Sequence, residues 1–178
     1  IYDQRGRLMA QTDVNGHDTD WFRDARDRVT LLLHPTATDG SYAVERFLHD
    51  DTTRTITHKD ARDVATIRTF DPLQRLIGER LGPLTRSRDY DPTGNLIEQT
   101  DYAGHATTFD YDAANRLVTQ NDGVGGSNLR TTVFTHDALG HVLSETVGAG
   151  TEMRVTEYRY AHPTYQRTHV RRQLDAEW

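Results

Sequence analysis

Cysteine is absent from this sequence, and long apolar runs are absent as well. Without cysteine the chain can form neither disulfides nor thiolate metal sites, and its redox compartment stays undetermined. The longest purely aliphatic run, Leu31–Leu33, is far too short to span a membrane. No stretch shows the apolar period of an amphipathic helix. These absences exclude disulfide-stabilised, membrane-spanning helical and helix-rich proteins.

An excess of positive charge is also lacking. The 178 residues carry 21 basic and 27 acidic side chains, a net charge of −6, which argues against nucleic acid as a partner. Apolar residues make up 35%, and the 13 glycines leave the total below the usual level of about 45–50%. The length suits one ordinary domain, and the composition favours a sheet with a solvated face over a thick core.

Turn signals recur at a fixed spacing in the stretch Tyr90–Leu117. Asp91, Asp101 and Asp112 each open a four-residue turn, and these aspartates stand 10 and then 11 residues apart. Asp at the first turn position, Pro at the second and Gly at the fourth are typical of type I β-turns. Between two of the turns, residues 107, 109 and 111 place a threonine and two aromatic rings on one strand face.

Read along the whole chain, the turns separate about 14 short strands. Consecutive strands with such short connections must pair antiparallel, so the sequence predicts an all-β fold. The predicted strands are 7–12, 17–23, 28–33, 42–49, 54–59, 64–70, 75–80, 96–100, 105–111, 117–121 and 142–146, with further ones around 134–136 and 156–160 and a final pair before 178. Longer connections or turns are expected at 34–40, 82–83, 122–128, 148–150 and 162–163.

The same pattern is written more than once. Shifted by 88 residues, Tyr2–Arg28 falls on Tyr90–Arg116 with 13 of 27 positions identical. A weaker copy, shifted by 41 residues, lies between Asp50 and Leu76. One hairpin is not stable alone, so stability must come from stacked neighbours. The 13 identities are Tyr2, Asp3, Gly6, Leu8, Gln11, Thr12, Asp13, Gly16, His17, Thr19, Asp24, Ala25 and Arg28.

The pattern Y-D-x-x-G-x-L-x-x-x-T-D-x-x-G-x-x-T-x-x-x-Y-D resembles the YD repeat of the rearrangement hot spot (Rhs) family. This family includes bacterial polymorphic toxins, the C components of insecticidal toxin complexes, and the animal teneurins. The resemblance covers Tyr2 to about Tyr160. It implies antiparallel hairpin repeats in a continuous, spiralling β-sheet that forms a hollow shell, which in the bacterial members encloses a toxic C-terminal region.

We therefore expect a YD-repeat array over residues 1–160 and a degenerate continuation of it over 161–178. The chain opens with Ile1, not Met, directly before a Tyr-Asp pair. This leads us to expect a fragment of a longer polypeptide, with two unpaired strand edges.

In the predicted repeat array, the frequent polar residues stabilise the turns in which they lie. A turn aspartate accepts a hydrogen bond from the backbone N–H two residues on, and glycine at the fourth position tolerates positive φ. An arginine begins a strand just after several turns, and we expect it to pair with a nearby turn aspartate or to stack on an aromatic ring. These arginines are Arg7, Arg28, Arg54, Arg75 and Arg116.

The nine histidines predict no metal site. His17 and His105 each follow a turn glycine, while His49 and His136 replace the aromatic residue before a turn aspartate. The others have no H-E-x-x-H or comparable ligand spacing. They are His34, His58, His141, His162 and His169.

Other catalytic patterns are incomplete. Asp71 and Asp91 each precede a proline, as in the D-P-x-G motifs of autoproteolysis at the end of the family's shell, but they sit in ordinary repeat turns and the closing motif is absent. Gly123–Ser127 lacks the Gly-Lys-Ser/Thr ending of a phosphate loop, and no serine stands in a nucleophile motif. The sequence therefore predicts no catalytic, cofactor-binding or metal-binding residue, and no enzyme.

Two functions stay open. The first is a structural wall segment of an Rhs-type shell that encapsulates a toxin region for delivery by a bacterial secretion system. Its partners would be flanking repeats of the same polypeptide, the toxin region and the delivery machinery. The second is a cell-surface adhesion or carbohydrate-binding module, in which an exposed aromatic ladder stacks on sugars; packing of the ladder within the sheet favours the first. The ladder is Phe109, Tyr111, Phe134, Tyr158 and Tyr160.

Overall fold

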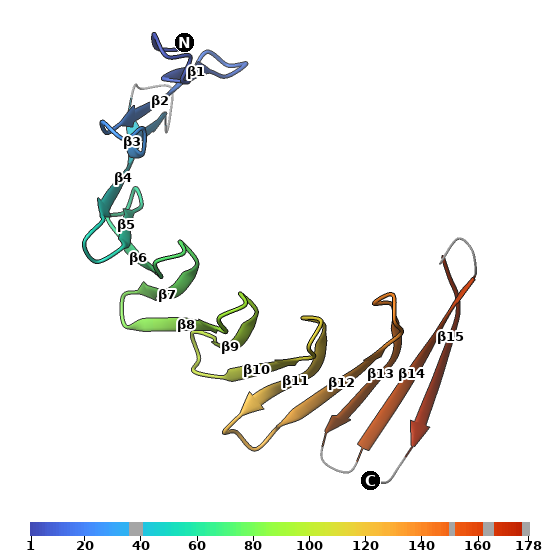
Figure 1. Ribbon diagram of the computed structural model, residues 1–178. Helices are drawn as coiled ribbons and strands as arrows, with labels where there is room; N and C mark the ends of the chain where they lie inside the picture. The colour runs from blue at the N-terminus through green and yellow to red at the C-terminus, as the bar shows by residue number, and fades with distance from the viewer. Residues whose placement is uncertain (36–40, 150–151, 162–165, 176–178) are drawn as a thin grey trace. The chain divides into compact units, whose positions relative to one another are not determined.

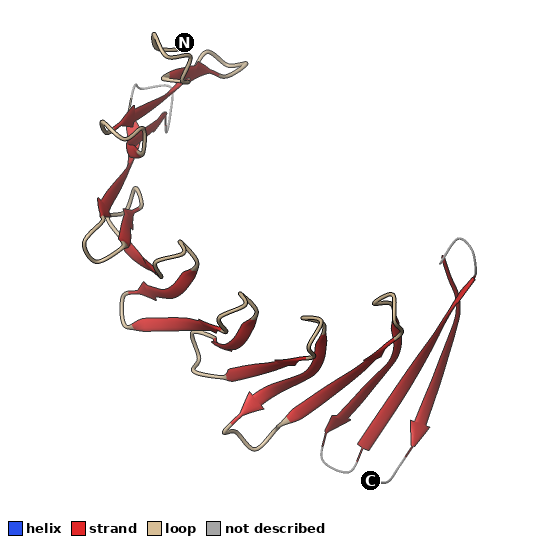
Figure 2. Ribbon diagram, in the orientation of Figure 1, coloured by secondary structure: helices blue, strands red, loops and turns tan. Residues whose placement is uncertain are grey.

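The computed structural model describes residues 1–35, 41–149, 152–161 and 166–175. Every regular element in these ranges is a β-strand, and neighbouring strands pair antiparallel, which confirms the predicted all-β array of hairpins (Figure 2). The chain divides into two units, Ile1–Thr85 and Arg86–Trp178. Within each unit the order of the strands in the sheet follows their order in the chain.

The described residues form 15 strands, which are labelled in Figure 1. The first unit holds β1 (Ala10–Thr12), β2 (Asp18–Arg23), β3 (Val29–Pro35), β4 (Tyr42–Asp50), β5 (Thr55–Lys59), β6 (Ala65–Phe70) and β7 (Leu76–Leu81). β8 (Leu84–Tyr90) begins at the end of the first unit and continues into the second. The second unit then holds β9 (Leu96–Thr100), β10 (Ala106–Tyr111), β11 (Leu117–Val124), β12 (Arg130–His136), β13 (Val142–Ala149), β14 (Glu152–Ala161) and β15 (Gln166–Asp175).

Several strand ends differ from the prediction. β11 continues into the expected loop because Asp122 pairs with Arg130 across the ladder. β13 runs through the expected turn, since Gly148 pairs with Met153. In the first repeat only Ala10–Thr12 is a strand, and Leu8 makes an isolated bridge to Tyr2. β3 ends at Pro35, within the expected connection. Residues 36–40, 150 and 162–163 lie outside the described part of the chain.

No hydrophobic core is present among the described residues. None of their hydrophobic side chains is buried, and the buried residues are Gly148 and the polar Asp71, Glu79, Thr132 and Thr156. The accessible surface is 12262 Å², against about 8,800 Å² for a typical folded monomer of this mass. The sheet therefore forms a single layer, and its stability must come from strand ladders and turns instead of a packed interior.

The two faces of the sheet in the first unit are unequal. Along β4 one set of alternate residues is half-buried, and the other contains the exposed side chains Tyr42, Arg46 and Leu48. Side chains directly opposite on neighbouring strands share a face, so the two faces can be followed across the unit, although on β3, β5 and β6 the side chains of both faces are half-buried. We call the face of Glu45 and Phe47 the covered face, and the face of Arg46 and Leu48 the open face.

Nine turns in the described residues share one backbone form. The N–H of the fourth residue donates to the carbonyl of the turn aspartate, and the N–H of the aspartate donates to the carbonyl of the fifth residue. The fourth residue always has positive φ, so each connection is a type I turn followed by a left-handed residue. These fourth residues are Gly6, Gly16, Asp27, Asp63, Gln74, Gly94, Gly104, Asn115 and Gly140.

Two glycine substitutions test this turn form. Gly104 has a φ of 84° and open space around it, whereas Gly78 lies within β7 without positive φ. We expect Gly104→Ala to lower the free energy of unfolding by about 1–2 kcal/mol because a side chain strains the left-handed backbone. Gly78→Ala should raise it by about 0.5–1 kcal/mol, since the added Cβ would lie 3.7 Å from Thr69 Cβ. Urea denaturation of both variants measures these free energies. Equal changes in the two variants would contradict the turn assignment.

Candidate functional site: linked turns along one sheet edge

The carboxylate of the turn aspartate is the centre of each turn. In the turn of Asp112, Oδ1 accepts the backbone N–H of Ala114 at 2.8 Å and of Arg116 at 3.0 Å. In all nine turns Oδ1 accepts the N–H of the residue four positions on, at 2.9–3.0 Å. We call this arrangement the aspartate clasp. Its aspartates are Asp3, Asp13, Asp24, Asp60, Asp71, Asp91, Asp101, Asp112 and Asp137.

The second carboxylate oxygen of most clasps accepts a side chain from that same later residue. Where the residue is arginine, Nε donates to Oδ2 at 2.6–2.8 Å. The pairing expected for five arginines is thus confirmed for four of them. Histidine takes the place of arginine in three clasps, with ring nitrogens 2.8–3.3 Å from Oδ2, and Asn95 takes it in one. The arginines are Arg7, Arg28, Arg75 and Arg116, and the histidines are His17, His105 and His141.

These hydrogen bonds keep the carboxylates ionised. The side-chain and backbone donors of Arg116 lower the pKa of Asp112 to about 2, and those of Arg7 do the same for Asp3. At Asp71, burial acts to raise the pKa, but the bonds from Arg75 outweigh it and the pKa is lowered. The pKa is lowered in all nine clasps. A carboxylate that is ionised and fully engaged as an acceptor is poorly suited to act as a general acid.

In a sheet of consecutive antiparallel strands, alternate turns lie along the same side of the sheet. The turns on one of these two sides share several features. These turns follow the position of the repeat tyrosine, so we call this side the Tyr-Asp edge. At five of its turns the two joined strands show a register shift, for example between the pairs Asp110↔Thr119 and Tyr111↔Leu117. Such bulges bend a strand, and Figure 1 shows the curled ends of β9, β11 and β13 beside these turns. The strand pairs joined by the described turns of Asp13, Asp60 and Asp101 on the other edge show no such shift.

An aromatic side chain caps the backbone at three of these bulges. The hydroxyl of Tyr111 donates to the carbonyl of Leu96 at 3.0 Å, and that of Tyr160 to the carbonyl of Val142 at 2.9 Å. His49 makes the equivalent contact with the carbonyl of Val29 at 2.8 Å. Tyr111 and His49 each precede a Tyr-Asp-edge turn, and all three acceptors follow an earlier turn of that edge. At these positions the residue before the turn aspartate therefore ties the strand end to the previous turn.

Arginine and asparagine side chains make links in the other direction. Nη1 of Arg7 lies 2.9 Å from Oδ1 of Asp27 in the next turn of the edge, and Nη1 of Arg116 donates to the carbonyl of Asp137 at 2.6 Å. Asn95 donates to Oδ1 of the next turn's Asn115 at 2.9 Å. One side chain thus closes its own clasp and holds the following turn. Neither type of link was predicted from the sequence.

Arg54 is the exception among the predicted arginines, and the pairing expected for it is wrong. The turn of Asp50 is one residue longer than the others, so Arg54 itself takes the left-handed position, with a φ of 53°. Its Nε donates to the carbonyl of Phe70 at 3.3 Å instead. The acidic residue that receives an arginine here is Asp51, whose Oδ1 lies 2.7 Å from Nη1 of Arg28.

The five rings of the aromatic ladder pack against the sheet. All five rings lie on one face by register and are half-buried, so none is an open platform. Tyr158 donates to Glu145 at 3.1 Å, and the guanidinium of Arg167 lies 5.3 Å from the centre of its ring. Together with the capping bonds of Tyr111 and Tyr160, these contacts favour packing over sugar stacking.

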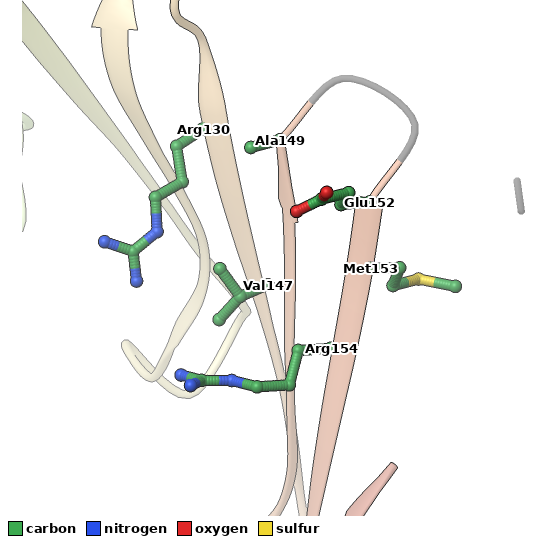
Figure 3. A pocket seen from close by; sticks show the side chains of 6 residues that line it. All are labelled: Arg130, Val147, Ala149, Glu152, Met153 and Arg154. Atoms are coloured by element: carbon green, nitrogen blue, oxygen red, sulfur yellow. The ribbon is translucent and has the colours of Figure 1, made fainter. Parts of the chain in front are cut away.

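One surface hollow of the described residues shows no catalytic grouping. Figure 3 shows a hollow of about 300 Å³ on β12, β13 and β14, where Arg130, Val147 and Arg154 lie on one side of the ribbon and Met153 points to the other. No nucleophile with an adjacent base lines it. Within the described ranges, no three histidine or acidic side chains are placed to share a metal ion. None of the described segments is a helix that could cross a bilayer.

A layer of β-hairpins with hydrogen bonds between successive turns is the architecture of a β-repeat protein. The family model named RHS Repeat matches residues 90–127, the region of the clasps of Asp91, Asp101 and Asp112. This match and the toxin relative described next support the resemblance to the Rhs/YD-repeat family that the repeat pattern indicated.

Known proteins extend the comparison. The chain is 28% identical over 172 residues to Double-stranded DNA deaminase toxin A of Burkholderia cenocepacia (strain H111), an alignment that covers 81% of this chain and 12% of that protein. Its fold is similar to parts of two crystal structures. For TcdB2-TccC3-Cdc42 the TM-score is 0.75 at 17% identity, and for TcdB2-TccC3-TEV it is 0.77 at 18% identity. The matches cover 98% and 97% of this chain, and 10% of each of those chains.

Acid should weaken the fold through the clasps. A carboxyl whose pKa is about 2 in the folded chain and 3.8 when unfolded contributes stability above pH 3.8 that is lost as the pH falls toward 2. We expect the urea midpoint to be constant near neutral pH and to fall steeply below about pH 4. Asp112→Asn should reduce stability at pH 7 and flatten this dependence. Asp110→Asn, two residues away on an exposed position outside the clasps, is the matched control and should change neither.

The capping bond can be tested by removing one hydroxyl. We expect Tyr111→Phe to lower the free energy of unfolding by about 1 kcal/mol, because it leaves the Leu96 carbonyl without this donor. Tyr2 occupies the same repeat position but is 68% exposed and makes no such bond among the described residues, so Tyr2→Phe should be neutral. A neutral result for both variants in thermal or urea melts would show that the cap does not stabilise the turn.

Proposed function

We propose that this chain is a wall segment of an Rhs-type shell that encloses a toxin region for delivery into target cells. The observation that carries the proposal is the single-layer sheet without a hydrophobic core, whose turn carboxylates are all engaged in structure. Such a layer is suited to separating two spaces. The similarity to toxin-complex structures supports the fold of a shell segment, and the step from fold to enclosure rests on family analogy.

The partners in this proposal are flanking repeats, the enclosed toxin region and the delivery machinery. β15 stands at one end of the strand order and offers an edge for a further strand. At the other end, Ile1 forms backbone hydrogen bonds with Ala10 of β1, which leaves only part of that edge open. The chain spans 12% of the length of the deaminase toxin it matches, and we propose that the chemistry of such a toxin lies outside the matched region. The chain itself would bind no cofactor or metal, carry out no catalysis, and reach its place of action by secretion or delivery.

The alternative function, a carbohydrate-binding adhesion module, rests on an exposed aromatic ladder. A carbohydrate-binding ladder needs open ring faces, but the five aromatic side chains are half-buried, and three of their hydroxyls donate to the chain's own acceptors.

Two measurements test the wall function. Alone, the chain should self-associate through its open edges in size-exclusion chromatography and show no turnover in hydrolase, nuclease and deaminase assays. In the longer polypeptide, the toxin region should resist protease, and the double change Asp112→Ala and Asp137→Ala should expose it, with Asp110→Ala as control. A stable monomer with turnover that a single His or Asp substitution abolishes without unfolding the chain would establish an enzyme instead.

A further inference from the structure

The covered face of the first unit satisfies its own polar groups. Glu45 accepts hydrogen bonds from His34 at 3.2 Å and from His58 at 2.7 Å, and the ring of Phe47 stacks on His58 with centroids 4.6 Å apart. Further along the same face, Arg68 donates to the buried Glu79 at 2.7 Å. These charged and polar side chains of the covered face are therefore already hydrogen-bonded within the chain.

The open face of the same unit carries apolar side chains in register, of which Phe22 and Leu48 are exposed and the others are half-buried. Phe22 lies opposite Leu31, and Leu33 lies opposite Val44. On the next rows, Leu48 and Ile67 both lie opposite Thr57 on β5, from β4 and β6 respectively. Leu48 is 68% exposed and Phe22 is 44% exposed, although both belong to strands. Polar side chains lie between them in register: Arg46 is opposite Leu31, and Thr57 separates Leu48 from Ile67. The open face therefore alternates apolar and polar side chains over these strands.

Two arginines flank this surface without a partner among the described residues. Arg46 lies on β4 between Val44 and Leu48, and Arg80 lies opposite Ile67. Both are exposed. Lys59 stands directly opposite Arg46 but is already paired with Asp63 at 3.0 Å. The arrangement is unusual within an acidic chain in which most arginines near the turns are bonded.

We infer that the open face of the first unit is a docking surface for an extended polypeptide segment in which apolar and acidic side chains alternate. We call this surface the open-face patch, and it consists of Phe22, Leu31, Leu33, Val44, Leu48 and Ile67 with Arg46 and Arg80. Apolar side chains of the segment would cover Leu48 and Ile67, and its carboxylates would pair with the two guanidinium groups, which suit carboxylates well.

Charge favours a peptide over other anionic partners. Asp18 and Asp20 lie on the same face as Phe22, at the β1–β2 side of the patch. A uniformly anionic surface such as a lipid bilayer or a nucleic acid backbone would meet these carboxylates and the net charge of −6. A short segment can place its carboxylates beside the arginines and avoid the aspartates. The inference concerns one unit and does not depend on the proposed wall function.

The test uses the full chain and a fluorescent peptide in which Leu and Glu alternate. We expect saturable binding by fluorescence anisotropy that weakens with salt, because exposed charges are screened. Leu48→Ser should weaken binding about tenfold by removing buried apolar area. Arg46→Ser should weaken it several-fold and reduce its salt dependence. Arg154→Ser, an exposed arginine on β14 in the second unit, is the matched control and should have no effect.

Other outcomes would overturn the inference. Equal binding of a peptide in which Leu and Lys alternate would show that charge plays no part. Binding that Leu48→Ser leaves unchanged would place the peptide elsewhere, for instance on an edge strand. Binding of phosphatidylserine vesicles but not of the peptide would identify a membrane surface. Self-association that Leu48→Ser abolishes, without peptide binding, would identify a second copy of the chain as the occupant.

Discussion

The hydrogen bonds of the turn aspartate are the interaction on which this structure depends. A sheet without a second layer cannot bury apolar side chains, and none of those described here is buried. The strands must therefore be held by their ladders and by connections that fix the register. A carboxylate such as Asp112 does this locally, because it binds two backbone N–H groups and the guanidinium of Arg116 at the same time. Placing that unit at every turn distributes stability along the chain, as expected of a repeat protein.

Turns could be predicted well from the sequence because their chemistry is local. The spacing of Asp91, Asp101 and Asp112 located three turns correctly, and the arginine after the turn was correctly expected to pair. The ends of longer strands were less predictable. Gly148 reads as a turn residue, yet it pairs on both sides of β13, because the ladder of a neighbouring strand outweighs local preference.

The links between turns could not be predicted because they depend on register between distant residues. The hydroxyl of Tyr111 reaches the carbonyl of Leu96 beside a bulge that shifts the strand register. The pattern of apolar and polar residues in β9 gives no sign of that bulge. Arg54 fails for a related reason. One additional residue in the turn of Asp50 moves the arginine into the left-handed position, a change that the regular sequence spacing hides. That no residue here is catalytic stays a prediction from motifs, and the engagement of the aspartates gives a physical reason to expect it.

The two links of the Tyr-Asp edge run in opposite directions, so each hairpin both donates to its neighbour and accepts from it. When the hairpin containing Leu96 has formed, it presents a bare strand edge, a carbonyl that accepts the hydroxyl of Tyr111, and an Asn95 side chain that donates to the next turn. A later hairpin finds all of these acceptors and donors already fixed by the earlier one. The sheet can therefore extend one hairpin at a time in the order in which a ribosome releases the chain, with each finished repeat acting as the template for its successor.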